Sequence, residues 1–387
     1  MSEQEMFRCT IMRGGTSKAV FLRYNDLPLE KELRDRIILG IYGSPDVGQI
    51  DGLGGARVQT SKLAIISPPS RSDADVDYTF GQVQLDSAKI DYSINCGNIS
   101  SAVGPFAIDE GMVAAKEPVT EVRIHNTNTQ KILIAKVPVK DGRAVVEGDF
   151  KVDTVPGTGA RIELDFSRTV GAATGKLLPT GNVLDVINVE GLGKVPVSMV
   201  DCANLMLFVN SKVLGLTGKE STPEIAANRE IMNSVESIRA TAAVEFGIVP
   251  RGQNATKVSP VRPIIALVSE AADYIDYVTK EVWSAEKFDF LARPFFNQHT
   301  GDAFPGTGTI CASVAAMLEG TIVNQVVSQK AKDTGVVRLG YPRGVNEVEV
   351  KISRNKDGFV VEHAQICRTA RRILDGYVYV KKSLIQI

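Results

Sequence analysis

Short apolar stretches of strand length alternate with polar turns along most of the chain. In the first half they cover residues 9–12, 19–22, 63–66, 122–124, 132–135, 144–146 and 162–165, and in the second half residues 195–200, 205–209, 263–268 and 377–380. Strands this short and this closely spaced are typical of a heavily twisted, barrel-like sheet. Long helical connections, which parallel strand–helix–strand units need, are rare between them.

Two segments are predicted to be helices that are apolar on every side. Small and apolar residues continue to Ile108 after the turn Asn95-Cys96-Gly97-Asn98, and to Met317 after the turn Pro305-Gly306-Thr307-Gly308. A helix without a polar face is a buried helix. Because the two resemble each other and lie in opposite halves of the chain, they indicate a duplicated architecture with a site between the halves.

Two amphipathic helices are also expected. One covers residues 29–42, and the other starts at Ser221-Thr222-Pro223-Glu224 and runs to about Phe246, with Gly247 ending it. The turn-rich segment 177–182 divides the chain into a domain of residues 1–182 and a domain of residues 183–376. The C-terminal strand, residues 377–387, can return to the first domain.

Composition and charge narrow the function classes. Among 387 residues, 44% are hydrophobic and 23% are charged, with 44 Lys plus Arg against 45 Asp plus Glu. This balance creates no field that favours nucleic acid or an anionic membrane. No apolar run approaches the length of a membrane span, and the acidic residues 1–6 lack the plan of a signal peptide, so we expect a cytoplasmic protein.

The cysteines and histidines do not form a metal-binding pattern. The five cysteines and three histidines are scattered, without CxxC or HExxH spacing. Neither a Walker motif nor GxGxxG after a strand is present. We therefore expect no metal, no cofactor and no disulfide framework.

Cys96 is the first candidate for chemistry. It precedes a predicted helix, where unpaired backbone N–H groups and the helix dipole stabilise a thiolate or a carboxylate. On this stretch alone, a small buried hydrophobic cysteine is an equally good interpretation.

Two further segments carry candidate polar groups. The turn Arg13-Gly14-Gly15-Thr16-Ser17-Lys18 offers N–H groups, hydroxyls and a cation to a carboxylate or phosphate, or is an ordinary hairpin turn with a solvated lysine. Lys62 directly precedes an apolar strand, where a partly desolvated amine can act as acid or base. The alternative is a lysine that reaches water at a strand end.

Four segments together resemble the PrpF family, over essentially the whole chain. They read Met12-Arg-Gly-Gly-Thr-Ser-Lys18, Gly54-Gly55 with Thr60-Ser61-Lys62, Asn95-Cys-Gly-Asn98 and Thr369-Ala-Arg-Arg-Ile373. The family contains cofactor-free isomerases of unsaturated di- and tricarboxylates. The resemblance implies an α+β fold like that of diaminopimelate epimerase: two similar domains, each a barrel-like sheet around a central helix, with the active site in the cleft between them.

The resemblance also implies a reaction, a 1,3-proton shift that moves a C=C bond. The first expectation is (R)-3-methylitaconate to 2,3-dimethylmaleate, with 2-methylaconitate and 4-oxalomesaconate as alternative substrates. In the family a lysine is the proton-transfer partner of the cysteine, and Lys62 matches that lysine. The resemblance therefore implies that Lys62 is the partner of Cys96. In the epimerase both central helices begin with a cysteine, whereas here Pro305 stands at the second position, which argues against a two-thiol racemase.

Substrate contacts are expected at the two helix starts and at the first glycine turn. These residues are Thr16, Ser17, Lys18, Gly97, Asn98, His299, Gly306, Thr307, Gly308 and Thr309. Asn204 is a further contact candidate, while Cys202 and Cys311 are expected in the core. Which of Lys62 and Cys96 is base, which polycarboxylate is the substrate, and whether the chain forms a homo-oligomer stay open.

Two other function classes remain. Cys96 could be the covalent nucleophile of a hydrolase or transferase, but that chemistry needs a histidine base nearby, and the three histidines are scattered. The same helix starts could instead bind a polycarboxylate without turnover.

Overall fold

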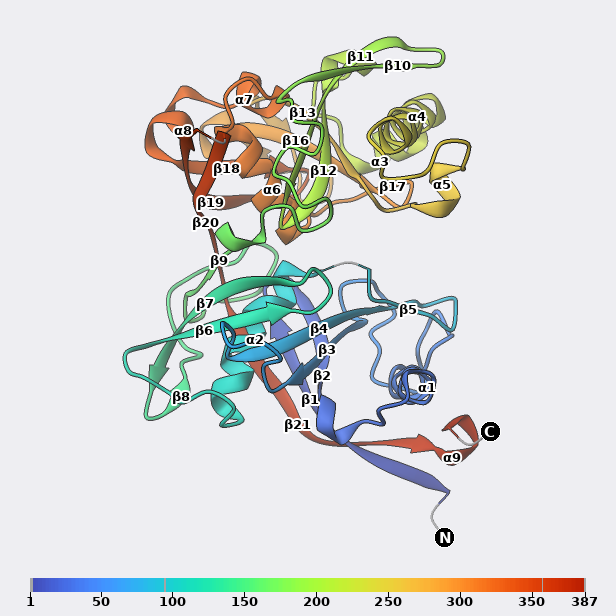
Figure 1. The fold of residues 1–387 in the computed structure, drawn as a ribbon, viewed down its shortest axis with the longest axis vertical. Coiled ribbons are helices and arrows are strands. Elements are labelled where there is room, and N and C mark those ends of the chain that lie inside the picture. The colour runs from blue at the N-terminus through green and yellow to red at the C-terminus, as the bar shows by residue number, and fades with distance from the viewer. Residues whose placement is uncertain (1–2, 94, 357, 386–387) are drawn as a thin grey trace. The chain divides into compact units, whose positions relative to one another are not determined.

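The computed structural model describes residues 3–93, 95–356 and 358–385, and the chain forms two units. The first unit contains Met1–Asp165 and Cys367–Ile387, and the second contains Phe166–Ile366. In each unit the strands surround one buried helix (Figure 1).

The first unit is a sheet with the strand order β21-β1-β2-β3-β4-β6-β7-β9. Neighbouring strands are antiparallel except β2 with β3 and β4 with β6, which are parallel. The strands are β1 (Gln4–Gly14), β2 (Ser17–Arg23), β3 (Lys62–Ser67), β4 (Val76–Val83), β5 (Ile90–Asp91), β6 (Val119–Asn126), β7 (Lys131–Lys140), β8 (Arg143–Ala144), β9 (Ile162–Asp165) and β21 (Ala370–Lys381). The helices are α1 (Lys31–Tyr42), α2 (Gly97–Asp109) and α9 (Lys382–Ile385).

Helix α2 lies inside this sheet and α1 lies outside it. Residues 99–108 of α2 are all buried, and the helix contacts β1, β2, β3, β6, β7, β8, β9 and β21. Phe21 of β2 packs against Phe106 of α2, with 5.2 Å between the ring centroids. On the other face of β2 and β3, Val20 and Leu63 pack in a separate apolar cluster with Ile38 of α1.

The second unit repeats this plan. Its strand order is β10-β11-β12-β13-β16-β18-β19-β20, again antiparallel except for two parallel pairs, β12 with β13 and β16 with β18. The strands are β10 (Asp185–Val189), β11 (Gly193–Cys202), β12 (Asn204–Asn210), β13 (Ile264–Glu270), β14 (Tyr274–Ile275), β15 (Val282–Trp283), β16 (Phe290–Phe296), β17 (His299–Thr300), β18 (Val336–Tyr341), β19 (Gly344–Asn355) and β20 (Gly358–Arg368). The helices are α3 (Thr222–Ala227), α4 (Arg229–Glu245), α5 (Ala255–Val258), α6 (Gly306–Met317), α7 (Ile322–Val326) and α8 (Gln329–Thr334).

The order of pairings makes the duplication explicit. From β1 to β9 the pairs run antiparallel, parallel, antiparallel, parallel, antiparallel, antiparallel, and from β11 to β20 they run in the same order. The buried helix follows β4 and β5 in the first unit and β16 and β17 in the second. Both apolar helices predicted from the sequence are therefore present, as α2 and α6.

The boundary between the units differs from the predicted position after residue 182. The segment that follows Asp165 is hydrogen-bonded to β11 and to Ala203, the residue between β11 and β12. Gly171 N donates to Asp201 O (2.8 Å), and Ala203 N donates to Thr169 O (3.2 Å). These bonds attach residues 166–182 to the second unit. At the other end, β21 pairs with β1 from Ala370 onward, so the return to the first unit begins at Cys367 and not at residue 377; residues 386 and 387 lie outside the described part.

The second amphipathic helix is interrupted, which the sequence analysis did not predict. Asn228 has extended backbone angles, with φ −90° and ψ 94°, and separates α3 from α4. Its side chain accepts from Ile231 N at 3.1 Å and caps α4. An asparagine favours this local bond over a place inside a helix.

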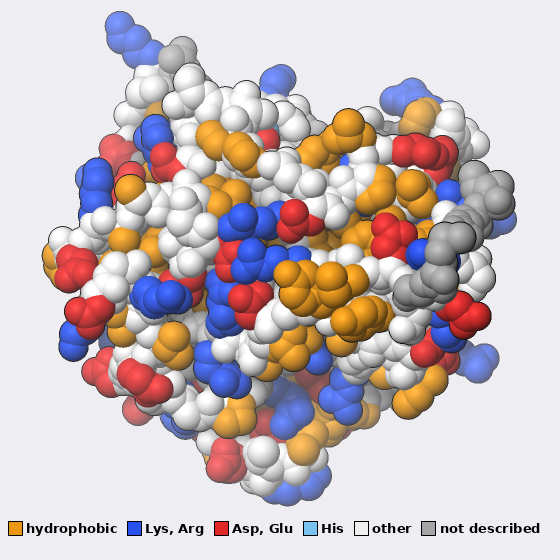
Figure 2. All heavy atoms as spheres, turned by 90° about the horizontal axis from the view of Figure 1, so that it is seen from below, with side chains coloured by type: hydrophobic (Ala, Val, Ile, Leu, Met, Phe, Trp, Pro, Cys, Tyr) orange, Lys and Arg blue, Asp and Glu red, His pale blue; other side chains and the backbone are white. Residues whose placement is uncertain are grey.

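On the face shown in Figure 2, basic and acidic side chains lie among one another. Within the described residues, no helix is long and apolar enough to cross a membrane.

Candidate active site

Lys62 is the first residue of β3, and its side chain lies on the face of the sheet that α2 covers. The alternation of the strand fixes this, because Leu63 and Ile65 belong to the apolar cluster under α1. The lysine is 8% exposed. Its backbone carbonyl accepts from the buried Tyr42 hydroxyl of α1, which fastens the start of the strand.

The amine of Lys62 has a neutral hydrogen-bond partner. Nζ donates to Oε1 of Gln82, which lies directly opposite on β4, at 2.8 Å. Nζ also lies 5.3 Å from the centroid of the Phe80 ring. The amine is therefore held inside the unit and does not reach out to solvent.

Cys96 is the N-cap residue of α2. Its backbone is extended, with φ −129° and ψ 103°, and its carbonyl accepts from N and from Oγ of Ser100, each at 3.0 Å. The first N–H groups of a helix have no partner within the helix. The half-buried thiol therefore stands where backbone donors and the helix dipole favour negative charge.

One face of β4 brings Lys62 and Cys96 to the same side of the sheet. Tyr78, Phe80 and Gln82 alternate along this face and span about 14 Å. Phe80 and Gln82 contact Lys62, while Tyr78 lies beside Cys96 and Ser100. Burial, followed by the neighbouring Cys96, raises the pKa of the Tyr78 hydroxyl well above its ordinary value.

The first glycine turn docks onto the start of α2. A Cβ on Gly14 would lie 2.4 Å from Asn98 O, and one on Gly15 would lie 2.4 Å from Asn98 Oδ1. Asn98 Nδ2 donates to Thr16 Oγ1 at 2.9 Å, and Asn98 Oδ1 accepts from Nε of the buried Arg368 at 3.2 Å. The glycines are needed because any side chain there would push the helix away.

The remaining residues of that turn lie beside the Lys62 strand. Ser17 is buried and Lys18 is half-buried, and Lys18 N donates to Gln59 O at 3.0 Å. In the first unit the structure thus brings together Thr16, Ser17, Lys18, Lys62, Cys96, Gly97 and Asn98.

The start of α6 in the second unit holds the other predicted residues. Pro305 is the N-cap residue, and Thr307 Oγ1 accepts from Asn204 Nδ2 at 3.2 Å. Thr309 is wholly buried, donates to Pro305 O at 3.0 Å and accepts from Asn346 Nδ2 at 2.9 Å, so its hydroxyl braces the turn. Gly306 and Gly308 are buried in the first turn of the helix, and the exposed His299 lies on β17, before it.

The two units differ in the ionisable groups at equivalent places. Where β3 begins with Lys62, β13 begins with Ile264, and where α2 is capped by Cys96, α6 is capped by Pro305. Cys311 is wholly buried with Sγ donating to Val200 O, and burial raises the pKa of its thiol well above the ordinary value. Cys202 is also buried. The pair of proton-transfer candidates therefore belongs to the first unit alone.

Sequence reasoning missed the residues that hold the site. Gln82, Tyr78 and Arg368 come from β4 and β20, and only the fold places them beside Lys62, Cys96 and Asn98. Gln49 was also missed: its Oε1 accepts from Ser61 Oγ at 2.7 Å, and Gly54 packs against its side chain. In the sequence, only the pair Gly54-Gly55 before Lys62 indicated that this segment packs closely against another part of the chain.

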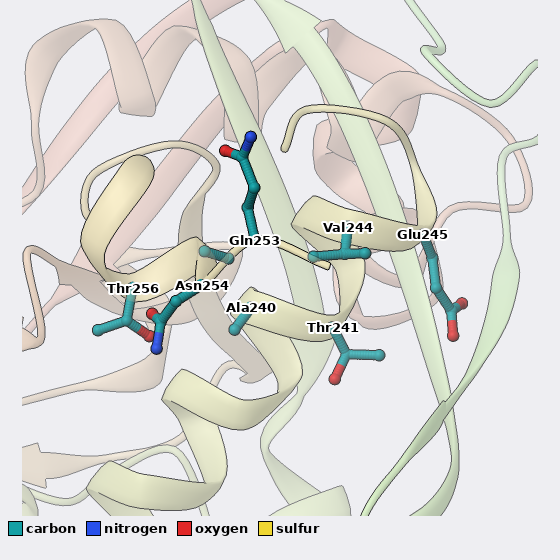
Figure 3. Close-up of a pocket in the computed structure, with 8 residues that line it drawn as sticks. Ala240, Thr241, Val244, Glu245, Gln253, Asn254 and Thr256 are labelled. Atoms are coloured by element: carbon teal, nitrogen blue, oxygen red, sulfur yellow. The ribbon is translucent and has the colours of Figure 1, made fainter. Parts of the chain in front are cut away.

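Other features of the described residues lie apart from these groups. Among them, no cluster of three or more His, Cys, Asp or Glu side chains is arranged to hold a metal ion. A hollow of about 460 Å³ on the second unit is lined by residues of α4 and the segment leading into α5, including Thr241, Glu245 and Asn254 (Figure 3). None of the predicted site residues lines it.

Comparisons with known proteins show which sequences this chain is similar to. The profile of the PrpF protein family matches residues 4–381. The 3-methylitaconate isomerase of Eubacterium barkeri is 51% identical over 386 residues, covering 99% of both chains. The 2-methyl-aconitate isomerase of Shewanella oneidensis is 36% identical over 386 residues, covering 96% of both chains.

Comparison with solved structures shows which known folds this chain is similar to. The crystal structure of a methylitaconate-delta-isomerase matches with a TM-score of 0.88 and 50% identity, over 99% of this chain and 98% of that chain. A hydroxyproline epimerase from Agrobacterium vitis matches with a TM-score of 0.54 and 13% identity, over 97% and 93%. The second likeness shows the fold alone, and it agrees with the mixed fold of helices and strands expected for an epimerase-like protein.

Proposed function

The chain belongs to the PrpF family, and from this premise we propose that it is a cofactor-independent isomerase that converts (R)-3-methylitaconate into 2,3-dimethylmaleate. The observation that carries the proposal is that Lys62 contacts Gln82 of β4 and Cys96 lies beside Tyr78 on the same face of that strand, in a chain that is 51% identical to a 3-methylitaconate isomerase. The alternative substrate 2-methylaconitate is supported by a more distant relative.

The reaction is a proton transfer between two carbons of one molecule. One of Lys62 and Cys96 takes the proton from the carbon that carries the methyl group and a carboxylate. The electron pair of that C–H bond forms the new C=C bond, and the pair of the old C=C bond takes a proton at the terminal methylene, which becomes the second methyl group. The other residue supplies that proton, so atoms and charge balance.

The start of α2 supports the charge that develops during the transfer. Removing a proton next to a carboxylate creates an enolate-like dianion, which needs donors that are already oriented. The free N–H groups at Gly97 and Asn98 are such donors, and Thr16 and Lys18 lie in the turn that packs against them. Contacts from Gly306, Thr307, Gly308, Thr309 and His299 stay predictions, as does a site in a cleft between two domains.

Proton NMR in heavy water tests this proposal with a small panel of unsaturated di- and tricarboxylates. We expect 3-methylitaconate to be consumed, with deuterium entering the new methyl group. Turnover of 2-methylaconitate or 4-oxalomesaconate in its place would reassign the substrate within the family. Binding without any exchange across the panel would show a polycarboxylate-binding protein, and an acyl-enzyme adduct on Cys96 seen by mass spectrometry would show a covalent nucleophile.

Two predictions about the protein in the cell go with this function. A cytoplasmic location fits a small-molecule isomerase without nucleic-acid or membrane partners. A homo-oligomer stays a prediction, which light scattering of the purified chain checks.

A further inference from the structure

The side-chain amide of Gln82 can have only one orientation. Its Nε2 lies 3.0 Å from the carbonyl of Ser61 and 3.2 Å from the carbonyl of Val58. Carbonyl oxygens only accept, so the NH₂ group must face them and Oε1 must face Lys62. The network therefore turns an acceptor, and not a donor, toward the amine at 2.8 Å.

This acceptor carries no charge. Within the part of the chain that the structure describes, no aspartate or glutamate forms an ion pair with Lys62. A carboxylate at the position of Gln82 would favour the ammonium form by Coulomb attraction, whereas an amide oxygen accepts from NH₃⁺ and from NH₂ alike. Gln82 can thus hold the amine in both protonation states.

The anchoring also limits where the amine can go. A lysine side chain has a flexible four-carbon stem, and its nitrogen samples many positions when it is free. Gln82 is 6% exposed, is fixed by two carbonyls and lies directly across the ladder from Lys62. With one N–H bound to Gln82, the nitrogen of Lys62 is held at one place beside β4.

We propose that Gln82 is a positioning residue that holds Lys62 Nζ at one place through a neutral acceptor, whether the amine is the group that takes the proton or the group that supplies it. This inference rests on the proposed proton-transfer role of Lys62. Gln82 acts through Lys62 and has no contact with the substrate in this account.

The substitution Gln82→Glu tests the neutral acceptor, because it keeps the shape and adds a charge; it also removes the NH₂ donor, a loss that Gln82→Met shares. We expect the midpoint of the kcat–pH profile to move to higher pH by about one pH unit, since an adjacent carboxylate favours the protonated amine. At neutral pH, kcat should fall by roughly tenfold if the neutral amine is the base. Gln82→Met, which removes the acceptor without a charge, should lower kcat with KM within a few-fold of wild type and with no such shift.

Gln365→Glu is the matched control. Gln365 lies on β20 in the second unit and is as buried as Gln82, each at 6% exposure. The substitution Gln365→Glu makes the same chemical change. A loss of thermal stability that comes only from burying a carboxylate should therefore appear in both variants. We expect lower thermal stability in both, and a moved pH midpoint in Gln82→Glu alone.

Three outcomes separate the failure of this inference from the failure of the proposed function. If Lys62→Ala abolishes turnover but Gln82→Glu keeps the wild-type pH profile, Gln82 does not position the amine, and the inference is wrong. If Lys62→Ala keeps wild-type turnover, the proton-transfer role of Lys62 is wrong and Gln82 has nothing to position. If the wild-type chain turns over none of the unsaturated acids in the panel, the proposed function itself is wrong.

Discussion

At the scale of residues, the environment of each side chain and not its type decides its role. Cys96 and Cys311 are both cysteines near the start of a buried helix. Cys96 caps its helix and is half-buried, whereas Cys311 is in the second turn, is wholly buried and donates to Val200 O. Of the two, only Cys96 stands at a helix N-terminus with a side chain that is not wholly buried.

We expect Cys96→Ser to lower kcat by about 10²–10⁴-fold, the usual worth of a positioned acid or base, while the thermal unfolding temperature stays near that of wild type. Cys311→Ser is the control: it should lower the unfolding temperature and leave kcat within a few-fold of wild type. Steady-state kinetics and calorimetry on the two variants check this. Wild-type turnover by Cys96→Ser would contradict a proton-transfer role.

Lys62→Ala should lower kcat by a similar factor for the same reason. Lys131→Ala makes an equal change at the first residue of another strand, β7, and should leave kcat unchanged. The same kinetic assay compares the two. Equal losses in both variants would indicate a structural effect of removing a lysine at a strand start.

At the scale of elements, close approach of β1 to α2 places the donors of the site. A Cβ on Gly14 would meet Asn98 O at 2.4 Å and the backbone of Ile99 at 3.2 Å. Neither backbone atom can move without shifting the start of the helix.

We therefore expect Gly14→Ala to cost about 1–3 kcal/mol of unfolding free energy and to lower kcat as well. Gly376→Ala is the matched control, because Gly376 also lies in a strand and its nearest neighbour would be Leu374 Cδ2 at 4.0 Å. Its effect should stay within about 0.5 kcal/mol. Urea unfolding measures both, and a neutral Gly14→Ala would show that α2 does not depend on this contact.

Asp289 joins three elements of the second unit. It lies just before β16, accepts from Arg338 of β18, and accepts from Ser328, the cap of α8, at 2.7 Å. Burial disfavours its charge, but the hydrogen bonds from Arg338 and Ser328 outweigh this and lower the pKa of the carboxyl below its ordinary value. A lowered pKa in the folded state means that the ionised group stabilises the fold above the unfolded pKa of about 3.9.

We expect Asp289→Asn to lower the unfolding free energy at pH 7 by about 1–3 kcal/mol. The difference from wild type should shrink as the pH falls below about 4, because the wild-type carboxyl then takes up its proton. Thermal unfolding at a series of pH values measures this. A difference that is constant down to pH 3 would rule out the ionised carboxyl as its source.

At the scale of the whole molecule, the duplication gives each unit its own core. The apolar cluster that includes Ile38 and Leu63 belongs to the first unit, and the one that includes Leu207 and Ile238 belongs to the second. The chain has one tryptophan, Trp283, which lies on β15 of the second unit. Its fluorescence therefore reports the second unit, whereas circular dichroism reports both.

If the two cores unfold separately, Gly14→Ala should shift part of the transition seen by circular dichroism and leave the transition seen by Trp283 fluorescence in place. Urea titrations with both probes measure this. An equal shift in both signals would show that the two units unfold as one.

The sequence by itself determined the elements whose signal is local. The apolar run after Cys96, its counterpart after Pro305, and the strand that begins at Lys62 follow from short-range hydrophobic patterning and glycine turns, and they are present as α2, α6 and β3. The four segments at residues 12–18, 54–62, 95–98 and 369–373 together pointed to the family, because each is a short contiguous motif.

Tertiary structure decided everything that depends on pairing across the chain. Gln82 opposes Lys62, Arg368 meets Asn98, and residues 166–182 join the second unit, because strand register and long-range hydrogen bonds, which no local pattern records, set these contacts. The break at Asn228 likewise depends on a side-chain cap that competes with the helix. The two candidates for proton transfer, Lys62 and Cys96, were thus readable from the sequence, and the residues that hold them in place were fixed by the fold.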